Sequence, residues 1–97
     1  MRSVVYAATF VAEADDIAAR IESLFGLTRA DQFRDDLERF CEALAETPGR
    51  GKTDHGYRTP LFGVVFERNW IFFRLDDQAA HFVHNVQSRR LKSAIRF

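Results

Sequence analysis

The chain has 97 residues, of which 46% are hydrophobic, with ten phenylalanines, five glycines and two prolines. This length suits one compact domain over residues 1–97, and the apolar content argues against disorder and low complexity. The apolar N-terminal run is too short for a signal peptide, and no run approaches the roughly 18 residues of a membrane span, so we expect a soluble, cytoplasmic protein without a membrane partner.

The formal net charge of zero conceals an uneven distribution. Residues 11–46 carry ten acidic and four basic side chains, whereas residues 47–97 carry nine basic and four acidic ones. Such polarity either orients the domain on a charged partner or reflects an evenly solvated surface. Both interpretations stay open at this point.

The first half of the chain predicts a strand followed by a helix. Residues 3–8 are rich in β-forming side chains and predict the first strand. From Ala14 to Phe25, apolar residues recur at intervals of three and four, which places them on one face of a helix and in the core. Gly26 is a natural C-terminal stop for this helix.

A second helix follows after a very short link. Thr28 and Asp31 resemble a capping box, so we expect the helix to begin there, and Pro48 prevents it from continuing. Its apolar stripe comprises Ala30, Phe33, Leu37, Phe40, Cys41 and Leu44. Two helices joined so closely must pack antiparallel, as a hairpin.

The second half of the chain predicts strands. Residues 50–56 are polar and contain glycine, which is typical of a loop. Residues 62–67 and 70–75 are two β-rich runs split by a turn at Arg68 and Asn69, and together they predict a β-hairpin.

A further turn at residues 76–78 and a last strand at 81–87 complete a mostly antiparallel sheet. The predicted class is α+β: an N-terminal strand and an antiparallel helical hairpin packed on a curved sheet. Residues 89–97 remain as a basic C-terminal tail.

The side chains that could bind metal or act as nucleophiles predict neither role. His81 and His84 are three apart, which on a regular strand sends them to opposite faces, and His55 lies in a remote loop. We therefore expect no metal site and no cofactor. Cys41 is the single cysteine, and its place in an apolar stripe favours a buried thiol over a nucleophile.

The basic residues of the second half are the candidates for binding. If the strands bring Arg58 near Arg89 and Arg90, the cluster could grip phosphates or an acidic protein groove. The alternative is that these are ordinary solvated charges. Both interpretations are kept.

Four features of the chain are informative together: the order of elements, the Thr47–Gly51 loop, the arginine in Gly56–Arg58 and the arginine pair that closes Val86–Arg90. In this combination the chain resembles the ParE branch of the RelE/ParE toxin superfamily. The resemblance covers nearly the whole chain. It implies a toxin of a bacterial type II toxin-antitoxin pair, with a cognate antitoxin that binds DNA through a ribbon-helix-helix end. ParE-type toxins inhibit DNA gyrase, and no direct DNA binding is expected without the antitoxin.

RelE-type relatives share this fold but cleave messenger RNA in the ribosome, commonly with a C-terminal tyrosine. On that pattern Lys52, Arg58 and Arg90 would be the functional set. Beyond Arg90, however, the chain has no tyrosine, histidine or carboxylate to move a proton, and its net charge of zero suits a polyanionic target poorly. We therefore favour a gyrase inhibitor without catalytic residues over an mRNA endonuclease.

In this interpretation the residues that contact the target are Arg58, Arg89, Arg90 and Lys92, and we expect a groove between the helices and the sheet to bind the antitoxin. The chain departs from the plainer ParE pattern in Pro60, which opens a strand, and in lacking a histidine just before Arg89. A third hypothesis is a non-toxic interaction module of the same fold.

Overall fold

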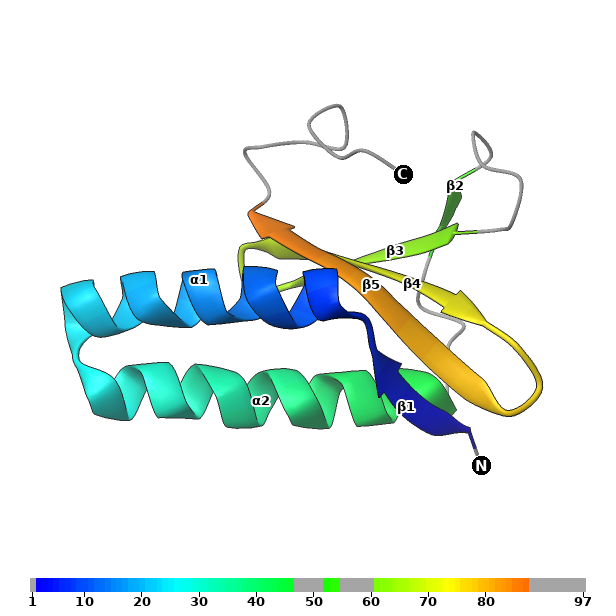
Figure 1. Ribbon diagram of the computed structural model, residues 1–97, viewed down its shortest axis with the longest axis horizontal. Coiled ribbons are helices and arrows are strands. Elements are labelled where there is room, and N and C mark those ends of the chain that lie inside the picture. Colours follow the sequence, from blue (N-terminus) through cyan, green and yellow to red (C-terminus); the bar gives the residue numbers. More distant parts are fainter. Residues whose placement is uncertain (1, 47–51, 55–60, 88–97) are drawn as a thin grey trace.

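A computed structural model describes residues 2–46, 52–54 and 61–87 of the chain. Its elements are β1 (Ser3–Tyr6), α1 (Ala8–Phe25), α2 (Leu27–Glu46), β2 (Lys52–Asp54), β3 (Leu61–Phe66), β4 (Asn69–Leu75) and β5 (Ala79–Gln87). The five strands form one sheet in the order β1-β5-β4-β3-β2, antiparallel except for the parallel pair β1 and β5. The two helices lie side by side as a hairpin against this sheet (Figure 1). The predicted α+β architecture is confirmed.

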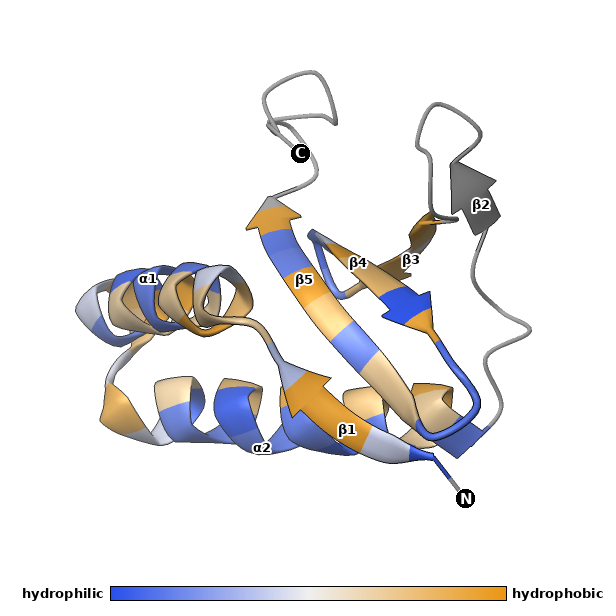
Figure 2. Cartoon of the chain, turned by 45° about the vertical axis from the view of Figure 1, so that its right-hand side comes forward, coloured by the Kyte–Doolittle hydropathy of each residue, from blue (hydrophilic) through white to orange (hydrophobic). Residues whose placement is uncertain are grey.

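The core lies between the helical hairpin and the sheet. Aromatic rings cross this boundary: Phe10 of α1 packs on Phe82 of β5, with ring centroids 5.7 Å apart, and Phe40 of α2 packs on Phe66 of β3 at 4.8 Å. Bands of hydrophobic and hydrophilic residues follow one another along β5 (Figure 2), without a strict alternation from one residue to the next.

The first helix begins earlier than predicted. α1 starts at Ala8 rather than Ala14, and β1 ends at Tyr6 rather than Ala8. The reason is Phe10, which is buried and extends the apolar stripe of α1 by one turn toward its N-terminus. Packing against the sheet here overrides the β propensity of the segment.

Gly26 alone connects the two helices. Its backbone angles, φ 97° and ψ 168°, fall in a region that is essentially restricted to glycine. Its N–H donates to the carbonyl oxygen of Glu22 at 2.9 Å, so α1 ends there as predicted. Because α2 already begins at Leu27, Thr28 is helical and is not the predicted N-cap residue.

The sheet differs from prediction where β2 pairs with β3 and at the turn between β3 and β4. Part of the predicted loop at residues 50–56 is strand β2, which pairs with β3. The turn between β3 and β4 lies at Glu67 and Arg68, one residue before the predicted position, because Phe66 pairs with Asn69. Glu67 takes a left-handed conformation, with φ 54°, that sequence patterns assign to glycine or asparagine.

The predicted turn at residues 76–78 is present and is organised by Asp76. One carboxylate oxygen accepts the backbone N–H groups of Gln78 and Ala79 at 2.8 and 2.7 Å, and the other bonds to Nε2 of His81 at 2.8 Å. These hydrogen bonds lower the pKa of Asp76 to about 2, and the one with His81 makes the largest contribution. β5 then begins at Ala79, two residues before the predicted start.

A β-bulge changes the faces of β5. Phe72 pairs with His84, but the next residue, Phe73, pairs with Phe82, so Val83 is an extra residue in β5. His81 and His84 therefore share one face of the sheet, and the prediction that they point to opposite faces is wrong. The described ranges nevertheless contain no group of three or more side chains that could hold a metal ion.

Candidate functional site

The four arginine and lysine residues predicted to contact a target, Arg58, Arg89, Arg90 and Lys92, lie outside the described residues. Lys52 opens strand β2, where its backbone pairs with Gly63 of β3. Gly63 in turn pairs with Phe72, and Phe72 with His84. Lys52 on β2 and His84 on β5 are therefore three strand spacings apart, which is about 14 Å across the sheet.

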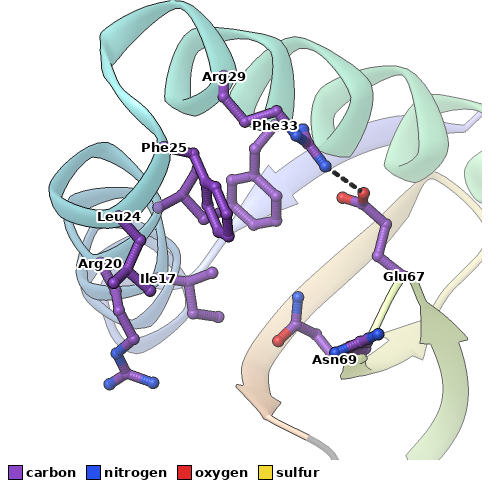
Figure 3. Close-up of a pocket in the computed structure, with 10 residues that line it drawn as sticks. Ile17, Arg20, Leu24, Phe25, Arg29, Phe33, Glu67 and Asn69 are labelled. Atoms are coloured by element: carbon purple, nitrogen blue, oxygen red, sulfur yellow. Dashed lines mark hydrogen bonds and ion pairs between the residues drawn. The ribbon is translucent and has the colours of Figure 1, made fainter.

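A concave surface lies at the other side of the molecule, between the tip of the helical hairpin and the β3–β4 turn (Figure 3). Its volume is about 810 Å³. We call it the tip groove; its lining residues are Ile17, Arg20, Ile21, Leu24, Phe25, Arg29, Phe33, Glu67, Arg68 and Asn69.

Helical spacing explains the apolar wall of the tip groove. The α1 residues that line it recur at intervals of three and four over the last turns of the helix, so they share one face. Phe33 comes from the second turn of α2 and is buried beneath this wall. The apolar stripe of α1 that packs in the core along the first part of the helix thus continues into the groove.

The sequence placed Leu24 and Phe25 in the core, and this prediction is wrong. Leu24 is 67% exposed and Phe25 is 71% exposed, and the adjoining Leu27 is 60% exposed. Ala14, Ile17 and the second stripe are buried as predicted, with Phe40 half-buried. The stripe alone cannot show where the opposing sheet ends, so the sequence predicted a groove between helices and sheet but not its position at the tip.

Charged side chains border the apolar wall. Arg29 of α2 donates to a carboxylate oxygen of Glu67 at 3.1 Å and so ties the hairpin to the β3–β4 turn. Both side chains are more than a third exposed, so this pair contributes at most about 1 kcal/mol. Arg20 and Arg68 make no ion pair within the described part of the chain, which leaves two unneutralised guanidinium groups beside the groove.

The tip groove is built for binding rather than for proton transfer. Guanidinium groups stay protonated at any physiological pH. Glu67 is the one acidic side chain among its lining residues, and that carboxylate is paired with Arg29. The groove can therefore bind a partner through apolar contacts and charge-assisted hydrogen bonds.

The opposite end of the hairpin holds a thiol that is closed off from reaction. Cys41 is fully buried between α2 and β1, close to Tyr6. Burial raises the pKa of the Cys41 thiol to about 12. The predicted role of Cys41 as a core residue is consistent with this environment, because a thiol that does not ionise is a poor nucleophile.

The edge of β5 is covered by side chains of α1 beyond the point where β1 ends. Thr9 donates its hydroxyl to the carbonyl oxygen of Val83 at 2.7 Å. A carboxylate oxygen of Glu13 accepts the N–H of Asn85 at 3.1 Å and lies 3.0 Å from Nδ1 of His84. These contacts satisfy main-chain groups that would otherwise be open to a further strand.

None of the helices in the described ranges combines the length and the apolar character needed to cross a lipid bilayer.

Comparison with known proteins identifies a family and a fold for this chain. The family described as "ParE toxin of type II toxin-antitoxin system, parDE" matches residues 4–92. Among solved structures, "Chromosomal ParDE TA system from P. aeruginosa" superposes with a TM-score of 0.74 at 16% sequence identity, over 90% of this chain and 96% of that one. At this identity the likeness establishes the fold. No curated protein sequence matches significantly.

Proposed function

Because the chain belongs to the ParE toxin family of type II toxin-antitoxin systems, we propose that it is a toxin that inhibits DNA gyrase and that a cognate antitoxin neutralises it. The observation that carries this proposal is the family match, which runs from residue 4 to residue 92 and so takes in both helices and the sheet. The antitoxin is proposed to be a ribbon-helix-helix protein, and the site of action the cytoplasm.

The choice of gyrase over messenger RNA rests on two features of the chain. Its net charge is zero, whereas a nuclease that works on a ribosome-bound polyanion gains from a strongly positive surface. Residues 91–97 also contain no tyrosine, histidine or acidic side chain for acid-base work. Both features suit a toxin that acts by binding.

The proposed contacts with the target are Arg58, Arg89, Arg90 and Lys92. Arginine is suited to this role because its planar group binds carboxylate and phosphate in a bidentate manner. Reversing the charge of one of these residues should weaken gyrase inhibition far more than reversing an exposed charge elsewhere on the protein.

The test is supercoiling of relaxed plasmid by purified gyrase, titrated with the purified protein. We expect inhibition that the antitoxin encoded beside the toxin gene relieves. A parallel assay with translating ribosomes measures transcript cleavage. Cleavage without any effect on gyrase would replace the gyrase proposal with RNase activity, and no effect in either assay together with normal growth on induction would indicate a non-toxic module.

A second experiment tests the contact residues. The double variant Arg89→Glu, Arg90→Glu should lose at least about tenfold in gyrase inhibition while its thermal unfolding is unchanged. Arg39→Glu is the matched control, because Arg39 is 77% exposed on α2 and pairs only loosely with Asp36, at 3.7 Å. Full inhibition by a folded double variant would refute this assignment.

A further inference from the structure

The two outer strands of the sheet, β1 and β2, differ in how their free edges are protected. β2 has only three residues, two of them charged, and short charged strands resist pairing with another chain. β1 contains two valines and a tyrosine, with no charged residue, proline or bulge. We infer that β1 pairs antiparallel with β1 of a second copy of this chain, so that the two sheets join into one across a two-fold axis.

The hydrogen bonds of β1 show which of its main-chain groups are open to a second strand. Ser3 and Ala7 donate their N–H groups to carbonyl oxygens of β5 and of the turn before it, at 2.8 and 2.9 Å. Successive residues of a strand turn their main-chain groups to opposite sides, so Val5 also bonds to β5, whereas Val4 and Tyr6 turn theirs away from it. The N–H and C=O groups of these two residues therefore point out from the sheet.

The chain covers the continuation of this edge but leaves β1 itself open. Just past the end of β1, Thr9 and Glu13 of α1 bond to main-chain groups of β5. Within the described ranges, no side chain bonds in this way to the main chain of Val4 or Tyr6. Natural sheets rarely leave an apolar edge strand unguarded, so the open stretch indicates that another strand binds there.

The charges around β1 favour a second copy as the source of that strand. At the N-terminal end, Arg2 donates from Nε to the carbonyl oxygen of Asp76 at 3.0 Å and forms no ion pair with any described residue. At the other end, the C-terminal part of α2 lies beside β1 (Figure 1) and carries two exposed carboxylates, those of Glu38 and Glu42. Burial raises the pKa of Tyr6, and the charges of these two carboxylates raise it further, so they lie close to the end of the strand.

An antiparallel copy brings these opposite charges together. The basic end of each β1 then lies against the acidic end of the other, and the two-fold axis makes this contact occur twice. Neither Glu38 nor Glu42 forms an ion pair with a described residue, so both are available to Arg2 of the second copy. The net charge of zero means that no long-range repulsion opposes the association of two copies.

The same geometry selects the register of the pair. Residues opposite one another in a sheet share a face, so the two-fold axis passes through Val4 or through Val5. An axis at Val4 sets this residue against its own copy and places Arg2 opposite Tyr6 of the second copy. Val4 packs on the core and Tyr6 on Phe10, so this face is the one that carries the helices and their carboxylates. An axis at Val5 would instead move Arg2 past the end of the partner strand, which favours Val4.

The size of the contact predicts a weak dimer. A single pair of short strands with flanking charges buries less than the standard interface of about 1,600 Å². We therefore expect a dissociation constant on the order of 10–100 μM. Sedimentation equilibrium of the purified protein, without any partner, should show the average mass rising from monomer toward dimer over about 1–300 μM. A monomer throughout this range would overturn the inference and leave β1 to a different occupant.

The charge contact is tested by reversal and rescue. Arg2→Glu alone, or Glu38→Arg with Glu42→Arg, should weaken dimerisation by about tenfold or more, because each change turns attraction into repulsion at both contacts. The three changes together should restore it, since the basic and acidic ends are then exchanged. Arg20→Glu is the matched control, because Arg20 lines the tip groove at the far end of the hairpin, and should change dimerisation less than about twofold. No rescue in the triple variant would contradict the assignment.

Disulfide formation tests the register. With the axis at Val4, position 3 of one copy and position 5 of the other form a non-hydrogen-bonded pair, with Cα atoms about 4.5 Å apart. Ser3→Cys combined with Val5→Cys should therefore give a covalent dimer on mild oxidation, whereas Val5→Cys alone should give little, because the two copies of position 5 are then diagonal, about 7–8 Å apart. Cys41 is fully buried and should not compete. Efficient crosslinking by Val5→Cys alone, or none by the double variant, would refute the pairing.

This inference stands apart from the proposed function. All three experiments use the purified protein alone, so their outcomes do not depend on gyrase or on an antitoxin. The dimer also leaves the tip groove open, because β1 lies beside the C-terminal part of α2 and the groove lies beside its start. A monomeric protein that inhibits gyrase would refute the dimer alone, and a dimer without any effect on gyrase would refute the proposed function alone.

Discussion

The two ends of the helical hairpin are packed very differently. At the end near β1, Phe10, Tyr6 and Phe82 are in mutual ring contact and Cys41 is completely buried. At the tip, around Gly26, large apolar residues stand in solvent. The apolar spacing of α1 is the same at both ends, so periodicity does not distinguish them.

The difference arises because the helices extend beyond the sheet. α1 has 18 residues and α2 has 20, which correspond to about 27 and 30 Å. Both continue past the β3–β4 turn before they meet at Gly26 (Figure 1). Residues at the packed end determine stability, whereas residues at the tip are free to contact a partner.

The largest effect is expected from Phe82→Ala at the packed end. The Phe82 ring is fully buried, with its centroid 5.4 Å from that of Phe73 and 5.7 Å from that of Phe10. Its removal should lower the free energy of unfolding by about 3–5 kcal/mol, measured by urea denaturation. A loss below about 1 kcal/mol would mean that this end is not the tightly packed one.

Reactivity of the Cys41 thiol tests how well the packed end excludes solvent. Its pKa of about 12 leaves almost no thiolate at pH 8, where a free cysteine is substantially ionised. Labelling with a thiol-specific reagent should therefore be at least about a hundredfold slower in the native protein than in urea. Similar rates in the two conditions would show that α2 separates readily from β1.

Gly26→Ala tests the junction itself. A Cβ atom at Gly26 would meet no other atom within 4 Å, so any cost comes from the backbone angles alone. We expect a loss of about 1–3 kcal/mol in unfolding free energy. Gly26→Asn should be no better than alanine, because asparagine tolerates the left-handed helical region and not this one. Recovery with asparagine would indicate a different turn.

Asn85 offers a stabilising change close to the covered edge of β5. Its side chain is buried at 1% exposure, and neither amide atom has a hydrogen-bond partner among the described residues. Asn85→Leu should raise the unfolding free energy by about 1–2 kcal/mol, because the polar atoms no longer have to be buried unpaired. A lower melting temperature would show that the amide is bonded in solution.

The smallest effect is expected at the tip. Phe25→Ala removes a ring that is 71% exposed, so the unfolding free energy should change by less than about 0.5 kcal/mol. The same substitution at Phe82 is expected to cost several kcal/mol, and this contrast puts the comparison between the two ends in quantitative form. A large loss at Phe25 would mean that the tip is packed in solution.

Local signals in the sequence predicted most of the fold. Helical periodicity and Gly26 gave the hairpin, and alternating β-formers gave β3 and β4. Features that depend on distant parts of the chain were not predicted: the start of α1, which Phe10 sets by packing on β5, and strand β2, which three polar residues form only because β3 offers an edge. The bulge at Val83 likewise has no local marker.

The candidate site was predicted to a smaller degree. The basic residues proposed from the family resemblance stay predictions. A groove between helices and sheet was expected, but its position at the tip was missed because Leu24 and Phe25 continue a core stripe, and only the position of the sheet reveals that nothing opposes them. One signal was present in the sequence: two large apolar residues immediately before a helix-ending glycine, followed by a third, Leu27.

The parallel pairing of β1 with β5 has a consequence for how this chain folds. Ser3 pairs with Ala79, which lies 76 residues later in the chain. The helical hairpin can form from local contacts, but the sheet it packs on is complete only when strands from distant parts of the sequence have paired. A chain cut before Ala79 lacks β5, the strand that joins β1 to β4, and therefore cannot complete this sheet.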